Sequence, residues 1–160
     1  MVINKDSDFV EFKKNYEGYL RCYVCKQKVC ACEDIVIDLE EAIVFQKGIE
    51  TEGNIKSNTQ IESRRDIVAE LSIDSTSLRA DDNIIASCNI EVVYDIDAGG
   101  DIEAGFDIKA SYGARAGGNI RAGGYIDIRG RVKAGGYIEA NDLALGRFSP
   151  QKDYSYCPLR

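Results

Sequence analysis

The chain contains no histidine and no tryptophan, and only 2 of its 160 residues are proline. Without histidine it lacks the side chain whose unperturbed pKa lies near neutral pH, and it also lacks the commonest metal ligand. Nucleophilic sites built on a Ser–His or Cys–His pair are therefore excluded. We expect a protein that is not an enzyme and that carries no catalytic cofactor.

Long apolar segments are missing as well. No stretch approaches the roughly 20 apolar residues that a membrane-spanning helix needs. The polar start, MVINKDSDFVEFKKN, lacks the apolar centre of a secretory signal. With so few prolines and no Ser/Gly-rich linker, nothing marks a domain boundary. The sequence predicts one cytoplasmic domain without a transmembrane segment.

Positive charge is in short supply, since the formal net charge is −7. An acidic chain is poorly suited to neutralising phosphates, so we expect no direct binding of nucleic acid. The same charge favours solubility and is compatible with a basic protein partner.

Large aliphatic residues return at every sixth position through most of the chain. Counting back from Ile138, the interval is broken once, by a five-residue step from Leu78 to Ile73. Ala114 is the single small residue in the series. The series reads Ile138, Val132, Ile126, Ile120, Ala114, Ile108, Ile102, Ile96, Ile90, Ile84, Leu78, Ile73, Ile67, Ile61, Ile55, Ile49, Ile43 and Ile37.

A second restricted position follows each of these residues by two, and it is mostly Ala, Ser or Thr. Side chains two apart point to the same face of a strand, so each hexad predicts a short strand with one large and one small inward side chain. The residue between them points outward and is often charged. A Gly-Gly or polar pair then turns the corner, and we expect glycine there because it tolerates positive φ.

A period of six does not fit a helix, because the isoleucines would spiral around its axis. Hairpins would leave the strands too short, and a phosphate-binding loop lacks its Lys-Ser/Thr. The pattern predicts an all-β fold, a single-stranded, three-faced β-helix (β-solenoid) with about 18 residues per coil. We expect about six coils between Ile37 and Ala140. The predicted internal ladders include Ile84–Ile102–Ile120–Ile138 and Ile90–Ile108–Ile126.

The open ends of a solenoid expose unpaired strands, so the flanks are expected to be caps. The predicted regions are an N-terminal cap with a Cys cluster (1–33), the solenoid (34–140) and a C-terminal cap or tail (141–160). Asp8, followed three residues later by Glu11, resembles a helix start and predicts a short helix over 8–16. The apolar residues expected to fold over the last coil are Leu143, Leu145, Phe148, Tyr154 and Tyr156.

Four of the six cysteines cluster, and four thiolates can hold a structural zinc ion. The first pair has the spacing of a zinc knuckle, but the C-x-C of the second pair is less usual. Free cysteines and disulfides are the alternatives. Cys88, two residues before Ile90, is expected to fill the core or a corner. The candidate zinc ligands are Cys22, Cys25, Cys30 and Cys32.

An acidic segment from Asp81 to Asp107 contains no Lys or Arg, and a basic segment follows from Lys109 to Lys133. Because residues 18 apart are predicted neighbours, Asp97 should lie near Arg115, and Arg121 should lie between Glu103 and Glu139. The charges form either solvated cross-coil pairs or a surface on which rods or a charged partner dock. The candidate interaction residues are Asp95, Asp97, Asp101, Glu103, Arg115, Arg121, Arg129, Arg131 and Lys133.

The segments AGGDIEAGFDIKA (98–110) and AGGNIRAGGYIDIRGRVKAGGYIEA (116–140) resemble the bactofilins, a polymer-forming cytoskeletal family, over roughly residues 49–140. They are also similar to the glycine-rich β-helix of the FapA family. The bactofilin resemblance implies a right-handed, three-faced β-helix that assembles end to end without nucleotide. The Cys cluster departs from that family. Hexapeptide-repeat acyltransferases share the period, but their small residue precedes the aliphatic one and they use a histidine base.

These observations leave three functions open. The first is a non-enzymatic scaffold that self-associates, or binds another protein, through its ends and charged faces. The second is an acidic, phage-type inhibitor that mimics a nucleic-acid backbone and binds a nucleic-acid-binding defence protein. The third is a hexapeptide-repeat transferase-like enzyme, which the absence of histidine disfavours. The expected partner is the chain itself or another protein.

Overall fold

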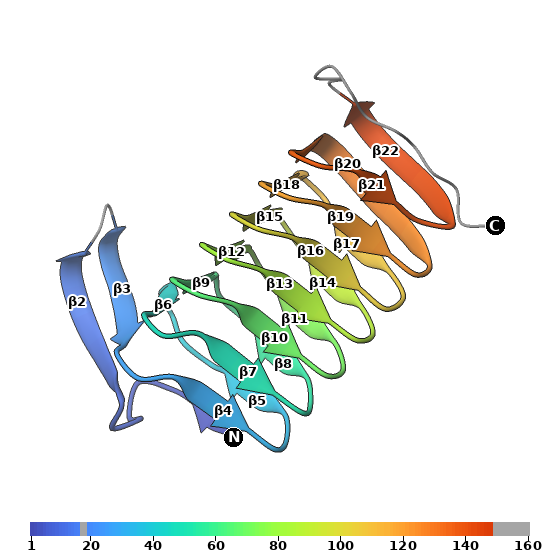
Figure 1. Ribbon diagram of the computed structural model, residues 1–160. Helices are drawn as coiled ribbons and strands as arrows, with labels where there is room; N and C mark the ends of the chain where they lie inside the picture. Colours follow the sequence, from blue (N-terminus) through green and yellow to red (C-terminus); the bar gives the residue numbers. More distant parts are fainter. Residues whose placement is uncertain (17–18, 149–160) are drawn as a thin grey trace.

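The computed structural model describes residues 1–16 and 19–148 (Figure 1). This part of the chain contains 22 strands and no helix. The strands stack coil upon coil into a rod, with β2 and β3 at one end and β22 at the other. The predicted all-β, three-faced β-solenoid is therefore confirmed.

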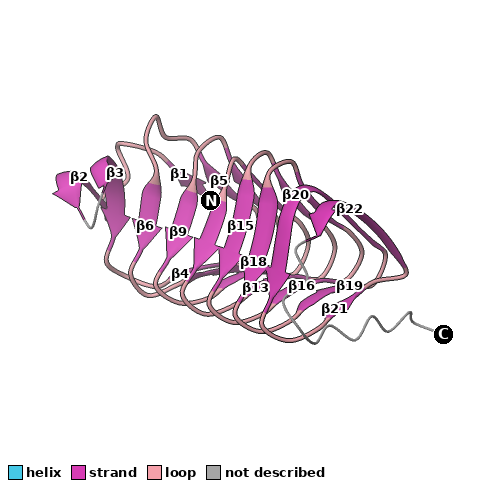
Figure 2. Cartoon of the chain, turned by 90° about the horizontal axis from the view of Figure 1, so that it is seen from above, coloured by secondary structure: helices cyan, strands magenta, loops and turns pink. Residues whose placement is uncertain are grey.

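The chain visits three faces in a fixed order, which we call B, A and C. Face B is a separate seven-stranded sheet: six of its strands lie between Ile37 and Ala140, in agreement with the six coils expected there, and β4 adds a seventh coil before them. Figure 2 shows strands of successive coils lying side by side. The strands of face B are β4 (Val29–Ala31), β7 (Ile49–Thr51), β10 (Ile67–Ala69), β13 (Ile84–Ala86), β16 (Ile102–Ala104), β19 (Ile120–Ala122) and β21 (Ile138–Glu139).

Faces A and C are joined into one 15-stranded sheet by β20 (Tyr125–Ala134), which runs along both. Face A holds β1 (Val2–Ile3), β5 (Ile35–Ile37), β8 (Ile55–Ser57), β11 (Ile73–Ser75), β14 (Ile90–Val92), β17 (Ile108–Ala110) and β22 (Asp142–Phe148). Face C holds β3 (Tyr19–Cys25), β6 (Ile43–Phe45), β9 (Ile61–Ser63), β12 (Leu78–Ala80), β15 (Asp95–Ala98) and β18 (Gly113–Ala116), with β2 (Val10–Tyr16) antiparallel to β3.

The predicted ladders exist. Ile84, Ile102, Ile120 and Ile138 are register partners on face B, and Ile90, Ile108 and Ile126 are register partners on face A. All of these side chains are buried. The repeat of 18 shortens to 17 where the five-residue step occurs, since Ile67 pairs with Ile84. The core is thus a stack of aliphatic layers.

The smaller inward residues do more than fill space. The hydroxyl of Ser75 donates to the carbonyls of Thr59 and Ser77, at 2.9 and 3.1 Å. The hydroxyl of Thr51 donates to the carbonyl of Glu33, and that of Ser63 to the carbonyl of Asp66. Burying a hydroxyl is tolerated when it is hydrogen-bonded. Ser and Thr at these positions therefore satisfy carbonyls where the chain turns.

The first coil departs from the predicted rhythm. Ile35, not Ile37, pairs with Ile55, and Ile37 pairs with Ser57, so this coil is 20 residues long. Ile37 is still buried, because Ile35 and Ile37 lie on the same side of β5. Placing Ile37 in the aliphatic ladder was therefore wrong. The extra residues lie between β5 and β6.

The predicted helix over 8–16 is also wrong. Residues 10–16 form β2, which pairs with β3 as an antiparallel hairpin on the edge of face C. Edge pairing satisfies the backbone groups of β3 that a short helix would leave unpaired. Parallel stacking extends past both predicted solenoid boundaries, because β3 and β4 pair with β6 and β7, and β22 pairs with β20.

The C-terminal tail is only partly described. Leu143 and Leu145 are half-buried and pack against the core, as expected. The other predicted contacts, of Phe148, Tyr154 and Tyr156, lie outside the described side chains.

The corner glycines are needed for close approach rather than for positive φ. Among the described glycines only Gly48 has a positive φ, of 93°. A Cβ on Gly105 would lie 1.9 Å from the carbonyl oxygen of Ser87 in the preceding coil, and one on Gly117 would lie 1.9 Å from that of Gly99. Stacked coils meet backbone to backbone here, which corrects the expected role of these glycines.

Candidate interaction surface

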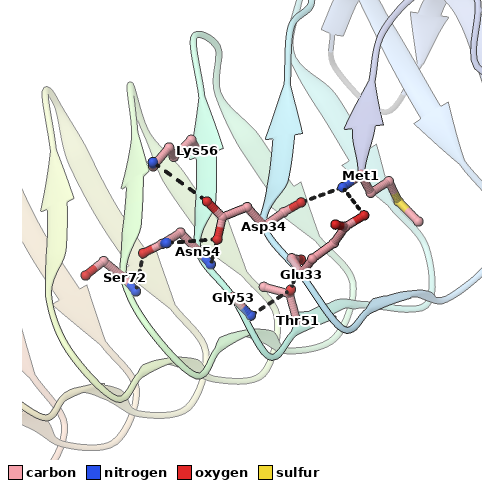
Figure 3. A network of polar contacts seen from close by, with 8 residues as sticks. All are labelled: Met1, Glu33, Asp34, Thr51, Gly53, Asn54, Lys56 and Ser72. Atoms are coloured by element: carbon pink, nitrogen blue, oxygen red, sulfur yellow. Dashed lines mark hydrogen bonds and ion pairs between the residues drawn. The ribbon is translucent and has the colours of Figure 1, made fainter.

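Two corners of the rod carry ladders of polar side chains. At the B–A corner, Oδ1 of Asp34 accepts a hydrogen bond from the backbone N–H of Asn54, at 2.8 Å, and Oδ1 of Asn54 accepts one from the N–H of Ser72 in the next coil, at 3.1 Å (Figure 3). The ladder continues through Asn89 to Asp107, and it ends where Oδ1 of Asp107 accepts a hydrogen bond from the backbone N–H of Tyr125. Each polar side chain therefore ties its coil to the next.

The second ladder runs along the C–B corner. Each side-chain oxygen in this ladder accepts a hydrogen bond from the backbone N–H of the next ladder residue along the rod. The ladder residues, in order, are Asp66, Asn83, Asp101, Asn119 and Tyr137, and the N–H of Tyr137 is the last donor. Sequence reasoning missed both ladders, although the residue directly before each large aliphatic carried the signal. Asp101, predicted as an interaction residue, is committed to this ladder.

The carboxylate of Asp34 starts the first ladder and accepts from both the backbone and the side-chain nitrogen of Asn54, at 2.8 and 2.9 Å. These hydrogen bonds lower the pKa of Asp34 below its usual value, with a smaller contribution from Lys56. Lys56 lies 3.8 Å from the other carboxylate oxygen (Figure 3). The ladder is therefore anchored on an ionised group at neutral pH.

The predicted charges on face B neutralise one another. The guanidinium of Arg121 lies 3.1 Å from the carboxylate of Glu139 and 3.6 Å from that of Glu103. It also donates to the hydroxyl of Tyr137. The predicted order Glu103–Arg121–Glu139 is confirmed, and these residues form a cross-coil cluster rather than free charges.

Face C differs, because its predicted charges are adjacent but unpaired. Asp97, Arg115 and Lys133 are register partners in successive strands, and Asp95 and Arg131 flank Gly113 on either side. In the described part of the chain none of these five side chains has an ion pair within 4.0 Å. They line one hollow together with Tyr112. Face C is thus the surface whose charged side chains are available to form ion pairs with a partner.

Arg129 lies apart from this hollow. It is exposed at the A–C corner, four residues before Lys133. In β20 the register shifts between Ile128 and Arg131, so Arg129 sits at an irregularity of the strand.

The structure does not assemble the predicted zinc site. Cys22 and Cys25 lie on opposite sides of β3, because side chains three apart in a strand alternate. Cys25 belongs to the main core, whereas Cys22 packs with Val24 and Val44, and burial raises the pKa of both thiols. Cys30 and Cys32 are exposed, and all five described cysteines are free.

The described residues contain no group of three or more His, Cys, Asp or Glu side chains placed to hold a metal ion. Cys88 lies at the B–A corner and is half-buried, which fits the corner position predicted for it. No helix in the described ranges has the length and apolar character needed to cross a bilayer. Comparison with protein-family models, curated proteins and solved structures finds no significant match.

Proposed function

We propose that the chain is a non-enzymatic scaffold that assembles end to end with copies of itself and offers the charges of face C to a protein partner. The observation that carries this proposal is the pair of edge strands on face B. β4 ends the sheet on one side and β21 ends it on the other, and both run in the same direction. Unpaired strand edges are templates for pairing with another chain.

At the first end, the strand-edge groups that have no partner among the described residues are the backbone N–H and C=O of Cys30. The N–H of Val29 donates to the carbonyl of Gly48, and the N–H of Glu52 donates to the carbonyl of Ala31, at 3.2 and 3.0 Å. Val29 and Ala31 therefore direct their backbone groups into the stack. Successive residues of a strand bond to opposite neighbours, so the N–H and C=O of Cys30 face away from the rod.

At the other end the corresponding residue is Ile138. The N–H of Ile120 donates to the carbonyl of Tyr137, at 3.0 Å, so Tyr137 faces the stack and Ile138 directs its backbone groups outward. Placing Val29 of one copy in register with Ile138 of another matches a buried aliphatic residue with a buried aliphatic residue. Such a head-to-tail contact does not close, and it generates a filament.

The variant Cys30→Pro tests this proposal. Proline removes the N–H that faces the open end and leaves the inward bonds of Val29 and Ala31 in place. We expect the wild type and the control Cys30→Ala to form rods of increasing length with concentration, by sedimentation velocity and electron microscopy. Cys30→Pro should form no particles that are longer than one molecule along the rod axis.

Two results would contradict end-to-end assembly. One is a wild type that shows no growth along the rod axis at the highest soluble concentration. The other is Cys30→Pro assembling as well as Cys30→Ala, with circular dichroism showing that both variants are folded.

The resemblance to bactofilins, seen in the Gly-rich repeats, supports the same function. Acidic mimicry has less support, because several carboxylates of the acidic segment already have partners. Asp101 and Asp107 belong to the ladders, Glu91 pairs with Lys109, and Glu103 pairs with Arg121.

A further inference from the structure

Face A collects most of the exposed apolar side chains of the described residues. Ten large apolar residues are exposed in the described ranges; Met1 lies beside Asp34 at the B–A corner, and eight others lie on this face or at its two corners. On a monomer, a concentration of apolar side chains on one face marks an interaction site. The eight residues are Val2, Val36, Leu71, Val93, Tyr94, Phe106, Tyr112 and Tyr125.

The B–A corner carries an apolar ridge along three successive coils. The N–H of Cys88 donates to the carbonyl of Leu71, and the N–H of Phe106 donates to the carbonyl of Cys88, both at 2.9 Å. These three residues are therefore stacked one above the other. Leu71 is 43% exposed and Phe106 is 60% exposed.

The A–C corner carries a second ridge. The N–H of Tyr112 donates to the carbonyl of Tyr94, and their rings pack edge to face with centroids 5.3 Å apart. Tyr112 is 63% exposed. Val93 adjoins Tyr94. The first ridge thus borders β11, β14 and β17, and the second ridge borders β14 and β17.

Between the ridges, the outward residues of face A form one column with an ordered charge pattern. Reading along the rod, the column is Val2, Val36, Lys56, Asp74, Glu91, Lys109, Asp127 and Ala144. Suppose that the same column of a second copy runs in the opposite direction, with its Glu91 opposite Glu91 of the first copy. The charges of the two columns are then complementary. Lys56 then meets Asp127, Asp74 meets Lys109, and Val36 meets Ala144.

We propose that face A binds face A of a second copy of this chain, with the two rods antiparallel and a two-fold axis along β14. In this arrangement each corner meets the same corner of the partner. Leu71 of one copy opposes Phe106 of the other, and Cys88 opposes Cys88. Glu91 opposes Glu91, and Lys109 neutralises each carboxylate at 2.8 Å. A single contact patch that complements itself is what a two-fold interface requires.

The size of the face suits such a contact. Seven strands from β5 to β22 span roughly 30 Å along the rod, and six residues from ridge to ridge span about 20 Å. The product is a flat area of about 600 Å². Because side chains project from the face, the accessible surface that it buries is larger and approaches the roughly 800 Å² per partner of a stable interface. The contact goes beyond the proposed function, because it uses a side of the rod that end-to-end assembly leaves free.

A charge swap tests the arrangement, in the Cys30→Pro background that blocks the ends. We expect this protein to sediment as a saturating dimer. Asp74→Lys alone and Lys109→Asp alone place like charges opposite each other, and each should weaken dimerisation by at least tenfold. The double variant Asp74→Lys/Lys109→Asp restores opposite charges and should recover most of the dimer. Ile85→Asp, an apolar-to-acid change on face B, is the control and should leave the dimer unchanged.

A second measurement locates the axis. In the Cys30→Pro background with Cys32 and Cys157 replaced by serine, a short bismaleimide should link two copies through Cys88, and Cys88→Ser should abolish that product. A monomer at all concentrations would assign face A to a different protein and overturn the proposal. So would a dimer that Asp74→Lys does not weaken, a double variant without recovery, or crosslinking that survives Cys88→Ser. Asp74→Lys with Cys30 intact should still assemble end to end, so failure of the two proposals is distinguishable.

Discussion

Gly105→Ala is expected to destabilise the protein strongly although it adds a single methyl group at a surface corner. The new Cβ would lie 1.9 Å from the carbonyl oxygen of Ser87 and 2.8 Å from its carbonyl carbon. Both are backbone atoms of the neighbouring coil, so no side-chain rotation relieves the contact. The coils must separate locally, and the hydrogen bond from the N–H of Gly105 to the carbonyl of Ala86 must lengthen.

Overpacking of this kind costs about 1–3 kcal/mol, and a backbone contact places Gly105→Ala at the upper end. The matched control is Ser87→Ala, at the same corner position one coil earlier, where a Cβ is already present. Chemical denaturation should show a change below about 0.5 kcal/mol for Ser87→Ala. Equal stability of the two variants would mean that the coils do not approach as closely as described.

The second large effect is expected from Ile84→Ala. Ile84 is fully buried between Ile67 and Ile102 in adjacent coils, so truncation leaves a cavity in the aliphatic stack. The expected loss is about 2–5 kcal/mol in the free energy of unfolding. Each aliphatic layer is held in place by its own coil, so few atoms can move into the cavity.

Ile85 supplies the control, because it is the next residue of β13 and points to the outside. Ile85→Ala removes the same atoms and should cost less than about 1 kcal/mol. If denaturation gives the two variants similar losses, the inward and outward assignment of β13 is incorrect.

The period of six made the faces, ladders and charge neighbours predictable. One large and one small inward residue per hexad are compatible with few folds other than a solenoid. With 18 residues per coil, counting by 18 then gave the neighbours Asp97–Arg115 and the Glu103–Arg121–Glu139 cluster. The same counting failed at Ile37, because both inward residues of β5 are isoleucine, so the interval from Ile37 to Ile43 is still six residues despite the two-residue insertion.

The N-terminal region was less predictable, since its residues satisfy the solenoid rather than their local preferences. Asp8 and Glu11 resemble a helix cap, but the open edge of β3 requires a strand beside it. The cysteine spacing resembled a zinc site until strand alternation separated Cys22 from Cys25. The polar ladders were visible as Asn or Asp before the aliphatic residue, but only stacked coils give that position a partner.

Paired cysteines test the stacking of coils most directly. In a variant whose Cys30, Cys32, Cys88 and Cys157 are replaced by serine, Glu103→Cys/Arg121→Cys places thiols on register partners in adjacent strands. Adjacent strands lie about 4.8 Å apart, within the Cα separation of roughly 4.4–6.8 Å that a disulfide spans. The comparison is Glu103→Cys/Lys109→Cys, which is closer in sequence but lies on faces B and A.

The solenoid predicts a rapid intramolecular disulfide for the pair 103 and 121 under mild oxidation, and little for the pair 103 and 109. A chain without stacked coils would favour the shorter loop. Preferential closure between 103 and 109 would therefore contradict the three-faced solenoid on which the proposed assembly depends.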